Sequence, residues 1–135
     1  MKLAISNIGW TSKEEPAVAE YLQSAGVKYV EIAPTKRWAE PIDASDAEIE
    51  AYREWWSKYD IAVVAFQSML FAHPEYTLFG SEDDRDITEK YLADFIGLAG
   101  KMGAERMVFG SPKNRQRAEM SIDDADAIAT GFFRS

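Results

Sequence analysis

Cysteine is missing from this 135-residue sequence. Disulfide bonds, thiolate metal sites and cysteine nucleophiles are therefore excluded for the chain. Histidine is nearly missing as well, because His73 is the only one. A lone histidine cannot supply the clustered ligands of a typical zinc site. Polar chemistry in this chain must therefore rely on carboxylates, amides, hydroxyls, lysine and arginine.

Long apolar runs and an excess of positive charge are absent too. The first residues lack the apolar core and the small-residue cleavage site of a signal peptide, and no run approaches the roughly 20 residues of a membrane span. We therefore expect a soluble, cytoplasmic protein without a membrane partner. With 15 lysines and arginines against 23 acidic residues, the net charge is −8. Nucleic acid is disfavoured as a partner, because binding to phosphate backbones needs many cationic contacts.

Apolar side chains, by contrast, are plentiful. Hydrophobic residues make up 47% and aromatic residues 13% of the chain, which is enough to bury the core of one ordinary domain. No low-complexity segment, long linker or change of composition marks a boundary inside the chain. We therefore expect residues 1–135 to form a single domain.

Four short apolar runs have the composition of buried β-strands. They cover residues 2–8, 27–33, 61–66 and the stretch that begins at Arg106. In the second run, the strand period of two places Val30 and Ile32 on one face and Glu31 on the other. Glu31 is therefore a charged residue on a strand that is otherwise suited to burial.

A helical pattern follows each of these runs. Ser12–Glu15 and Ser45–Glu48 have the spacing of capping boxes, which predicts helix starts at both places. Acidic residues at 82–84 predict a third start, and Ser121 predicts a fourth. The apolar set of the fourth helix consists of Ile122, Ala125, Ile128, Ala129, Phe132 and Phe133. We therefore expect an α/β fold with four strand–helix units.

Alternating strands and helices predict parallel strands joined by right-handed crossovers. Two arrangements meet this description: an open, doubly wound sheet, and part of a (β/α)8 TIM barrel. An open sheet usually carries a glycine-rich phosphate loop after its first strand, whereas residues 7–12 contain a single glycine. The barrel is therefore favoured. Because a complete barrel takes about 250 residues, we expect this chain to supply about four βα units, a half-barrel.

Polar residues stand where the predicted strands end. Asn7, Glu31 and Gln67 hold these positions on the first three strands, and Ser111 follows the fourth. The carboxyl ends of barrel strands meet at one face, where the active sites of TIM barrels are found. We therefore expect these four side chains to converge.

Residues 98–112, LAGKMGAERMVFGSP, resemble the fourth-strand region of the xylose-isomerase-like TIM barrels, the sugar phosphate isomerase/epimerase superfamily. Residues 30–34, 66–68 and 78–80 fall where this family has comparable pieces. The resemblance covers essentially the whole chain, but only the amino-terminal half of the family's barrel. It implies half of an enzyme that moves protons or a hydride between adjacent carbons of a sugar or related polyol.

The resemblance also implies that the metal site lies elsewhere. The family's metal ligands, a Glu/Asp/His/Glu set, sit at the ends of the strands from the fifth onwards. No metal ligand is therefore assigned within residues 1–135, and a divalent metal is expected only in a complete barrel. We expect the chain to be a truncated gene product or a half-barrel expressed as such, and to be inactive alone.

Glu31 is the candidate catalytic residue. A carboxylate buried near the top of a barrel has its pKa raised towards the range in which it can act as a base, and it can also bind a substrate hydroxyl. In the resemblance, Glu31 matches an acidic position on the second strand that neighbours the substrate in some relatives. The alternative is a structural ion pair with Lys36 or Arg37.

Four of the candidate substrate-binding residues have a structural alternative. Lys113 and Arg115 could hold a phosphate or a carboxylate, or belong to a solvated loop. His73 could exchange a proton with the substrate, or simply line a loop. Trp10 could offer a flat wall to a sugar, or pack in the core. The full candidate set is Asn7, Trp10, Gln67, Ser68, His73, Ser111, Lys113 and Arg115.

Three alternatives accompany the isomerase/epimerase-like half-barrel. Two copies could associate as a homodimer that completes the barrel, because four open strands leave two unpaired edges. A non-catalytic module that binds a small polyol is the second alternative. An abasic-site endonuclease-like barrel is the third, and both the net charge of −8 and the missing metal ligands count against it.

Overall fold

The fold is built on a parallel β-sheet. The computed structural model describes residues 3–134, so Lys2 of the first predicted strand lies outside the described residues. Within them, the sheet has four strands in the order β1-β2-β3-β4, and each neighbouring pair is parallel. The strands are β1 (Ala4–Ser6), β2 (Tyr29–Ile32), β3 (Ala62–Phe66) and β4 (Arg106–Met107). The predicted α/β fold with parallel strands is confirmed.

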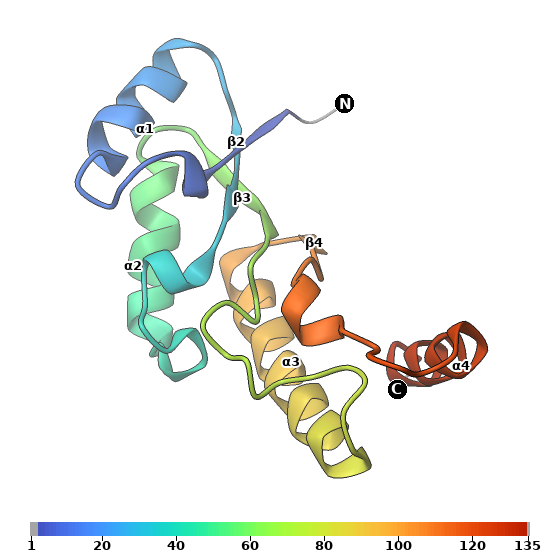
Figure 1. Ribbon diagram of the computed structural model, residues 1–135. Coiled ribbons are helices and arrows are strands. Elements are labelled where there is room, and N and C mark those ends of the chain that lie inside the picture. Colours follow the sequence, from blue (N-terminus) through green and yellow to red (C-terminus); the bar gives the residue numbers. More distant parts are fainter. Residues whose placement is uncertain (1–2, 135) are drawn as a thin grey trace.

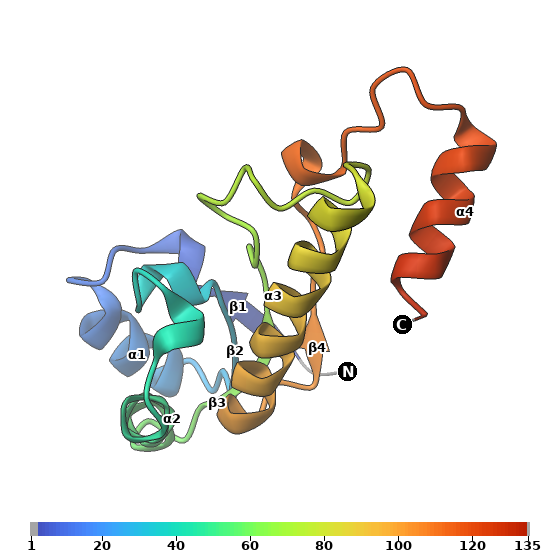
Figure 2. The same ribbon diagram turned by 90° about the horizontal axis from the view of Figure 1, so that it is seen from below.

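A helix follows each strand in the chain. The helices are α1 (Glu15–Ser24), α2 (Asp46–Ser57), α3 (Glu82–Met102) and α4 (Ile122–Phe132). Short 3-10 helices lie between them, namely η1 (Asn7–Gly9), η2 (Pro34–Lys36), η3 (Pro41–Asp43) and η4 (Pro112–Arg115). Figures 1 and 2 show α4 standing apart from α1 and α2. Of the helices in residues 3–134, none combines the length and the apolar composition that crossing a lipid bilayer requires.

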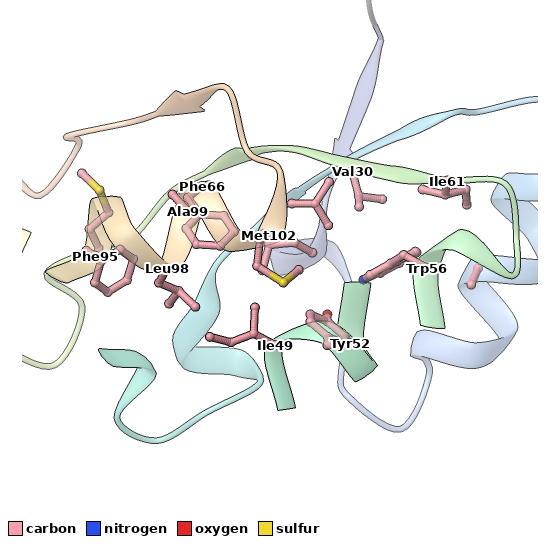
Figure 3. Packing of buried hydrophobic residues seen from close by; sticks show 14 of the residues in the cluster. Val30, Ile49, Tyr52, Trp56, Ile61, Phe66, Phe95, Leu98, Ala99 and Met102 are labelled. Atoms are coloured by element: carbon pink, nitrogen blue, oxygen red, sulfur yellow. The ribbon is translucent and has the colours of Figure 1, made fainter. Parts of the chain in front are cut away.

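The core fills the space between one face of the sheet and helices α1 to α3. Val30 and Ile32 of β2 are fully buried, as the alternation of this strand predicted, and Phe66 of β3 joins them. Figure 3 shows Val30 and Phe66 next to side chains of α2 and α3. The helices contribute, among others, Ala19, Leu22, Ile49, Tyr52, Trp56, Phe95, Leu98 and Met102. Apolar burial on one face leaves the other face of the sheet for polar groups.

Two predicted helix starts have the hydrogen bonds of a capping box. Ser45 precedes α2, and its hydroxyl accepts from the backbone N–H of Glu48 at 3.3 Å. The Glu48 carboxylate in turn accepts from the backbone N–H of Ser45 at 2.9 Å. Ser81 and Asp84 form the same reciprocal pair at the start of α3. These serines therefore satisfy backbone groups that a helix end leaves without partners.

The capping box predicted at Ser12–Glu15 is wrong. Helix α1 begins at Glu15. The N-cap residue is Glu14, and its side chain makes no capping hydrogen bond. The Ser12 hydroxyl donates instead to the carbonyl oxygen of Lys36, 3.2 Å away. Thr11 and Glu14 form the local turn in its place, with the Thr11 N–H donating to the Glu14 carboxylate at 2.8 Å. The pair with the three-residue spacing is therefore Thr11 and Glu14, one residue earlier in the chain than the predicted pair.

A β-bulge in β3 decides which face its last side chains occupy. Val64 is an extra residue on β3, so Glu31 of β2 lies opposite Ala65. The bulge places Phe66 in the core and Gln67 on the open face beside Glu31. Strict alternation along the strand would have exchanged the faces of these two side chains. The bulge therefore positions a polar side chain at the end of the sheet.

The fourth helix buries little of its apolar set. It begins after Ser121, as predicted, and this serine accepts a hydrogen bond from the backbone N–H of Asp124. Of the apolar set only Ala125 is fully buried, whereas Ile122 and Phe133 are 64% and 58% exposed. A helical pattern indicates which side of a helix could be buried and not whether a partner surface is present.

Candidate functional site

Side chains from three neighbouring strands meet beyond the carboxyl ends of the sheet. Gln67, which follows β3, donates from its amide nitrogen to the Glu31 carboxylate at 2.6 Å and also to the Ser6 hydroxyl. Ser6 lies opposite Glu31 in the sheet register, so these two are neighbours on the face away from the helices. We call Ser6, Glu31 and Gln67 the strand-end cluster. It brings together two of the four polar positions that were expected to converge, together with a serine that the sequence reading missed.

The strand-end cluster offers the hydrogen-bonding groups that a polyhydroxyl ligand needs. Both hydrogens of the Gln67 side-chain amide are donated inside the cluster, to Ser6 and to Glu31. The side-chain carbonyl oxygen of Gln67 therefore remains as an acceptor. One carboxylate oxygen of Glu31 likewise has no hydrogen-bond donor among residues 3–134. The hydroxyl of Ser6 accepts from Gln67 and keeps its own proton to donate. Acceptors and a donor therefore lie side by side.

The ion pair considered for Glu31 does not form within the described chain. Lys36 donates to two backbone carbonyl oxygens in and just after η1, one of them at 2.6 Å. Arg37 lies over the ring of Tyr52, with its guanidinium carbon 4.9 Å from the ring centroid. Both nearby cations are thus used to hold loops in place, and the carboxylate of Glu31 has an amide as its neighbour instead of a cation.

Asn7 and Trp10, two of the predicted substrate-binding residues, lie inside the fold. The side-chain oxygen of Asn7 accepts from the backbone N–H of Ala33 at 2.7 Å, and Asn7 is only 1% exposed. The Trp10 ring meets the Trp56 ring edge to face, with 6.4 Å between centroids. Both residues support the loops at the strand ends, and neither lines the cavity described next.

A cavity opens at the carboxyl ends of β3 and β4, next to the strand-end cluster. Its volume is about 650 Å³, within the range of about 300–1,000 Å³ that small-molecule sites occupy. The predicted site residues that line it are Gln67, Ser68, His73, Ser111 and Lys113. We call it the β3–β4 cavity. Gln67 belongs to both features and so links the strand-end cluster to the cavity.

Two residues with left-handed backbone lie at this cavity. Ser68 and Ala72 both line it, and both have a positive φ, of 56° and 70°. Left-handed backbone costs about 1 kcal/mol or more for a residue with a side chain. Such strain is common where a loop is held in a fixed shape around a ligand site. The loop after β3 therefore holds two unfavourable backbone conformations where it lines the cavity.

His73 lies in the cavity wall between two carboxylates. Its Nδ1 is 2.9 Å from an oxygen of Glu75, and its Nε2 is 3.6 Å from an oxygen of Glu40. The ring also stacks on Tyr76, with 5.2 Å between centroids. The pKa of Glu75 lies below its usual value, chiefly through a hydrogen bond from its own backbone N–H and then through His73. His73 therefore anchors the loop, with both ring nitrogens directed at carboxylates.

Asn114 is a site residue that the sequence reading missed. It is 4% exposed, and its side-chain nitrogen donates to the backbone carbonyl oxygens of His73 and Tyr76, both at 2.7 Å. The backbone carbonyl oxygen of Asn114 accepts from the backbone N–H of Leu78 at 2.8 Å. Asn114 thus ties the loop after β4 to the loop after β3. Its position among the basic residues of one loop gave no sign of this role.

The basic run after β4 does not act as one patch. Lys113 lines the β3–β4 cavity, whereas Arg115 lines a separate hollow with Phe109 and Phe133. Arg117 donates to the backbone carbonyl oxygen of Met120. The 3-10 turn of η4 separates these side chains, and only Lys113 is placed to meet a ligand of the cavity.

The described residues do not fit a metal ion. Within residues 3–134, no three histidine, cysteine, aspartate or glutamate side chains are grouped where they could hold one together. The divalent metal that the resemblance implies would need ligands from outside this part of the chain.

No protein-family model matches the chain, and no curated protein matches it in sequence.

Proposed function

We propose that this chain is the amino-terminal half of a (β/α)8 barrel of the sugar phosphate isomerase/epimerase kind, and that it binds the hydroxyl groups of a sugar or polyol. The strand-end cluster of Ser6, Glu31 and Gln67 is the observation that carries the proposal. It joins a hydroxyl, a carboxylate and an amide from three successive parallel strands. TIM-barrel sites are found at this end of the strands.

The part of this chain in the proposed reaction is to bind and orient the substrate. Glu31 accepts hydrogen bonds from substrate hydroxyls and is the one ionisable group of the cluster, so it is also the candidate base. Gln67 holds the carboxylate in position from the neighbouring strand. Because residues 3–134 offer no metal-holding group, no metal-dependent step is assigned to them. Turnover of a sugar by the monomeric chain with added divalent metal would contradict this division of roles.

Binding of xylitol tests the proposal directly. Addition of xylitol to the isotope-labelled chain should shift the backbone resonances around Ser6, Glu31 and Gln67 in nuclear magnetic resonance spectra. Glu31→Gln keeps the shape but removes a charged acceptor, and hydrogen bonds to charged groups contribute about 1.5–3 kcal/mol. We expect this variant to bind xylitol at least about tenfold more weakly.

The matched control for this test is Glu20→Gln. Glu20 is an exposed residue of α1, away from the strand ends, and its replacement removes the same charge. Its affinity for xylitol should equal that of the original chain. Equal affinity of Glu31→Gln and Glu20→Gln, or xylitol-induced shifts confined to other parts of the chain, would show that the strand-end cluster is not a polyol site.

A homodimer that completes the barrel is the second candidate. In the described residues, β1 and β4 each have one strand neighbour, so each leaves an edge unpaired. Close to the β1 edge an apolar side chain, Leu3, is 63% exposed. A second copy, or further strands of a longer chain, would cover these edges in the same way. Sedimentation of the isolated chain separates these two cases.

A further inference from the structure

The walls of the β3–β4 cavity are more apolar than a fully hydroxylated sugar requires. Its carbon-rich lining consists of Leu70, Phe71, Ala72, Pro74, Val108 and Pro112. Phe71 is 65% exposed and Val108 is 48% exposed, so both present apolar surface to whatever occupies the cavity. Covering apolar surface contributes about 25 cal/mol per Å². A ligand that fills the cavity therefore has an apolar body.

The cavity lining carries a single formal positive charge and no carboxylate. Lys113 supplies the charge, and its ammonium has no hydrogen-bond or ion-pair partner among residues 3–134. His73 is already directed at the carboxylates of Glu40 and Glu75 and offers no free nitrogen. The hydroxyls of Ser68 and Ser111 have no side-chain partners within the described chain. One free cation flanked by hydroxyls suits an anionic group.

The number of cations indicates a single negative charge. Arg115 and Arg117 are close to Lys113 in sequence but are directed elsewhere, so neither can form the bidentate pair that favours phosphate. The net charge of −8 opposes the approach of a dianion more strongly than that of a monoanion. A carboxylate meets both conditions better than a phosphate.

We propose that the β3–β4 cavity binds a small organic monocarboxylate with an apolar body, its carboxylate at Lys113 and Ser111 and its body on Phe71 and Val108. A hydroxyl beside the carboxylate would reach Gln67 and Ser68 at the inner end of the cavity. The inference deepens the proposed function and rests on it for the position of the site, because it names the substrate class that the strand ends receive. Its charge selectivity follows from Lys113 alone.

Mandelate and its neutral amide, mandelamide, form a matched pair of probes, because they differ in charge and share the apolar ring and the hydroxyl. We expect the chain to bind mandelate at least about tenfold more tightly than mandelamide in calorimetric titrations at low salt, with the difference shrinking as salt is added. Lys113→Gln should weaken mandelate binding at least about tenfold and leave mandelamide binding unchanged. Lys90→Gln, an equal change of charge on the exposed side of α3, should alter neither.

Several results would overturn the inference. Equal affinity of the chain for the two probes, or an unchanged mandelate affinity in Lys113→Gln with native circular dichroism, would show that Lys113 does not select an anion. Tighter binding of inorganic phosphate than of mandelate would contradict the monocarboxylate class. Xylitol binding at the strand-end cluster without mandelate binding would overturn this inference and leave the proposed function standing. Mandelate binding without xylitol binding would support the inference while the polyol proposal fails.

Discussion

Gln67 illustrates how one side chain can link a fold to a site. Its backbone N–H donates to the carbonyl oxygen of Ile32 and so continues the sheet, while its side chain bridges Glu31 and Ser6. The same residue lines the β3–β4 cavity. A carboxylate positioned by a neutral amide keeps its charge available to a ligand, whereas a carboxylate paired with a cation does not. At the scale of single residues, the polar chemistry of this end therefore depends on an amide.

Tyr91 of α3 is a second residue whose surroundings have a measurable consequence. Its ring stacks on that of Tyr76, with 4.3 Å between centroids, and its hydroxyl has no hydrogen-bond partner within residues 3–134. Burial, followed by the nearby Tyr76, Glu40 and Glu75, raises the pKa of Tyr91 to about 12. In an unfolded chain a tyrosine titrates near about 10.

The raised pKa of Tyr91 predicts a loss of stability at alkaline pH. Below pH about 10 the phenol is protonated in both states, and the free energy of unfolding does not change with pH through this group. As pH rises towards about 12 the free energy of unfolding falls, because the unfolded chain releases the phenol proton first. Tyr91→Phe should remove up to about 3 kcal/mol of this alkaline loss and raise stability at pH 7 by about 1 kcal/mol, since an unpaired buried hydroxyl disappears. Urea unfolding at pH 7, 10 and 12 measures both changes.

The control for this prediction is Tyr21→Phe. Tyr21 lies on α1 and is 71% exposed, so the loss of its hydroxyl should leave both the stability at pH 7 and its alkaline dependence as they were. If Tyr91→Phe and Tyr21→Phe unfold alike at every pH, the Tyr91 hydroxyl is not buried in the manner described.

At the scale of elements, the four helices differ in what they contribute to the core. Helices α1, α2 and α3 each supply buried side chains to the cluster that packs on the sheet. Helix α4 supplies no fully buried member to it and stands apart in Figures 1 and 2. A serine hydroxyl nevertheless accepts from the backbone N–H three residues further on at the start of α2, α3 and α4, although only α2 and α3 have the reciprocal bond of a capping box. The same local interaction should therefore have different global effects.

Replacement of matched caps tests this difference. Ser45→Ala at α2 should lower the free energy of unfolding by about 1 kcal/mol, because the helix it starts carries Trp56 into the core. Ser121→Ala at α4 should leave the main unfolding transition almost unchanged and reduce only the helical signal. Tryptophan fluorescence follows the core through Trp56, and circular dichroism follows all helices. Equal destabilisation by the two changes would show that α4 unfolds together with the sheet.

At the scale of the whole molecule, the sheet is covered on one face and open at both edges. The covered face holds the apolar core, and the open face holds the strand-end cluster. Unpaired edges and exposed apolar side chains favour association with further strands. In the barrel proposed above, those strands would surround the cluster and complete the site. The association state is therefore linked to function.

We expect the isolated chain to sediment as a dimer at concentrations of tens of micromolar. Leu3→Lys places a charge beside the β1 edge and should weaken the dimer at least about tenfold, because lysine on an edge strand opposes pairing. Tyr21→Lys makes the same kind of change on an exposed helical position away from the edge and should leave the dimer intact. A chain that stays monomeric and well folded throughout this range would favour strands from a longer chain as the missing half.

The sequence by itself determined the order of strands and helices and the inward face of β2. Strand and helix periods are local properties, so the burial of Val30 and Ile32 and the opposite placement of Glu31 could be predicted without a structure. Capping boxes at Ser45 and Ser81 reflect equally local hydrogen bonds. The helix α4 was predicted as an element, but its exposure was not, because exposure depends on a partner surface.

Only the tertiary structure decided where Gln67 points. Alternation from Val63 would have put Gln67 on the covered face, and the extra residue at Val64 reverses this. A bulge forms when pairing with a neighbouring strand, and burial of Phe66, outweigh regular alternation, so no single segment encodes it. Packing in the same way assigned Asn7 and Trp10 to the interior and left Lys113 free at the cavity. The arrangement of side chains at the carboxyl ends of the strands thus depends on how the strands pair and pack in the folded chain.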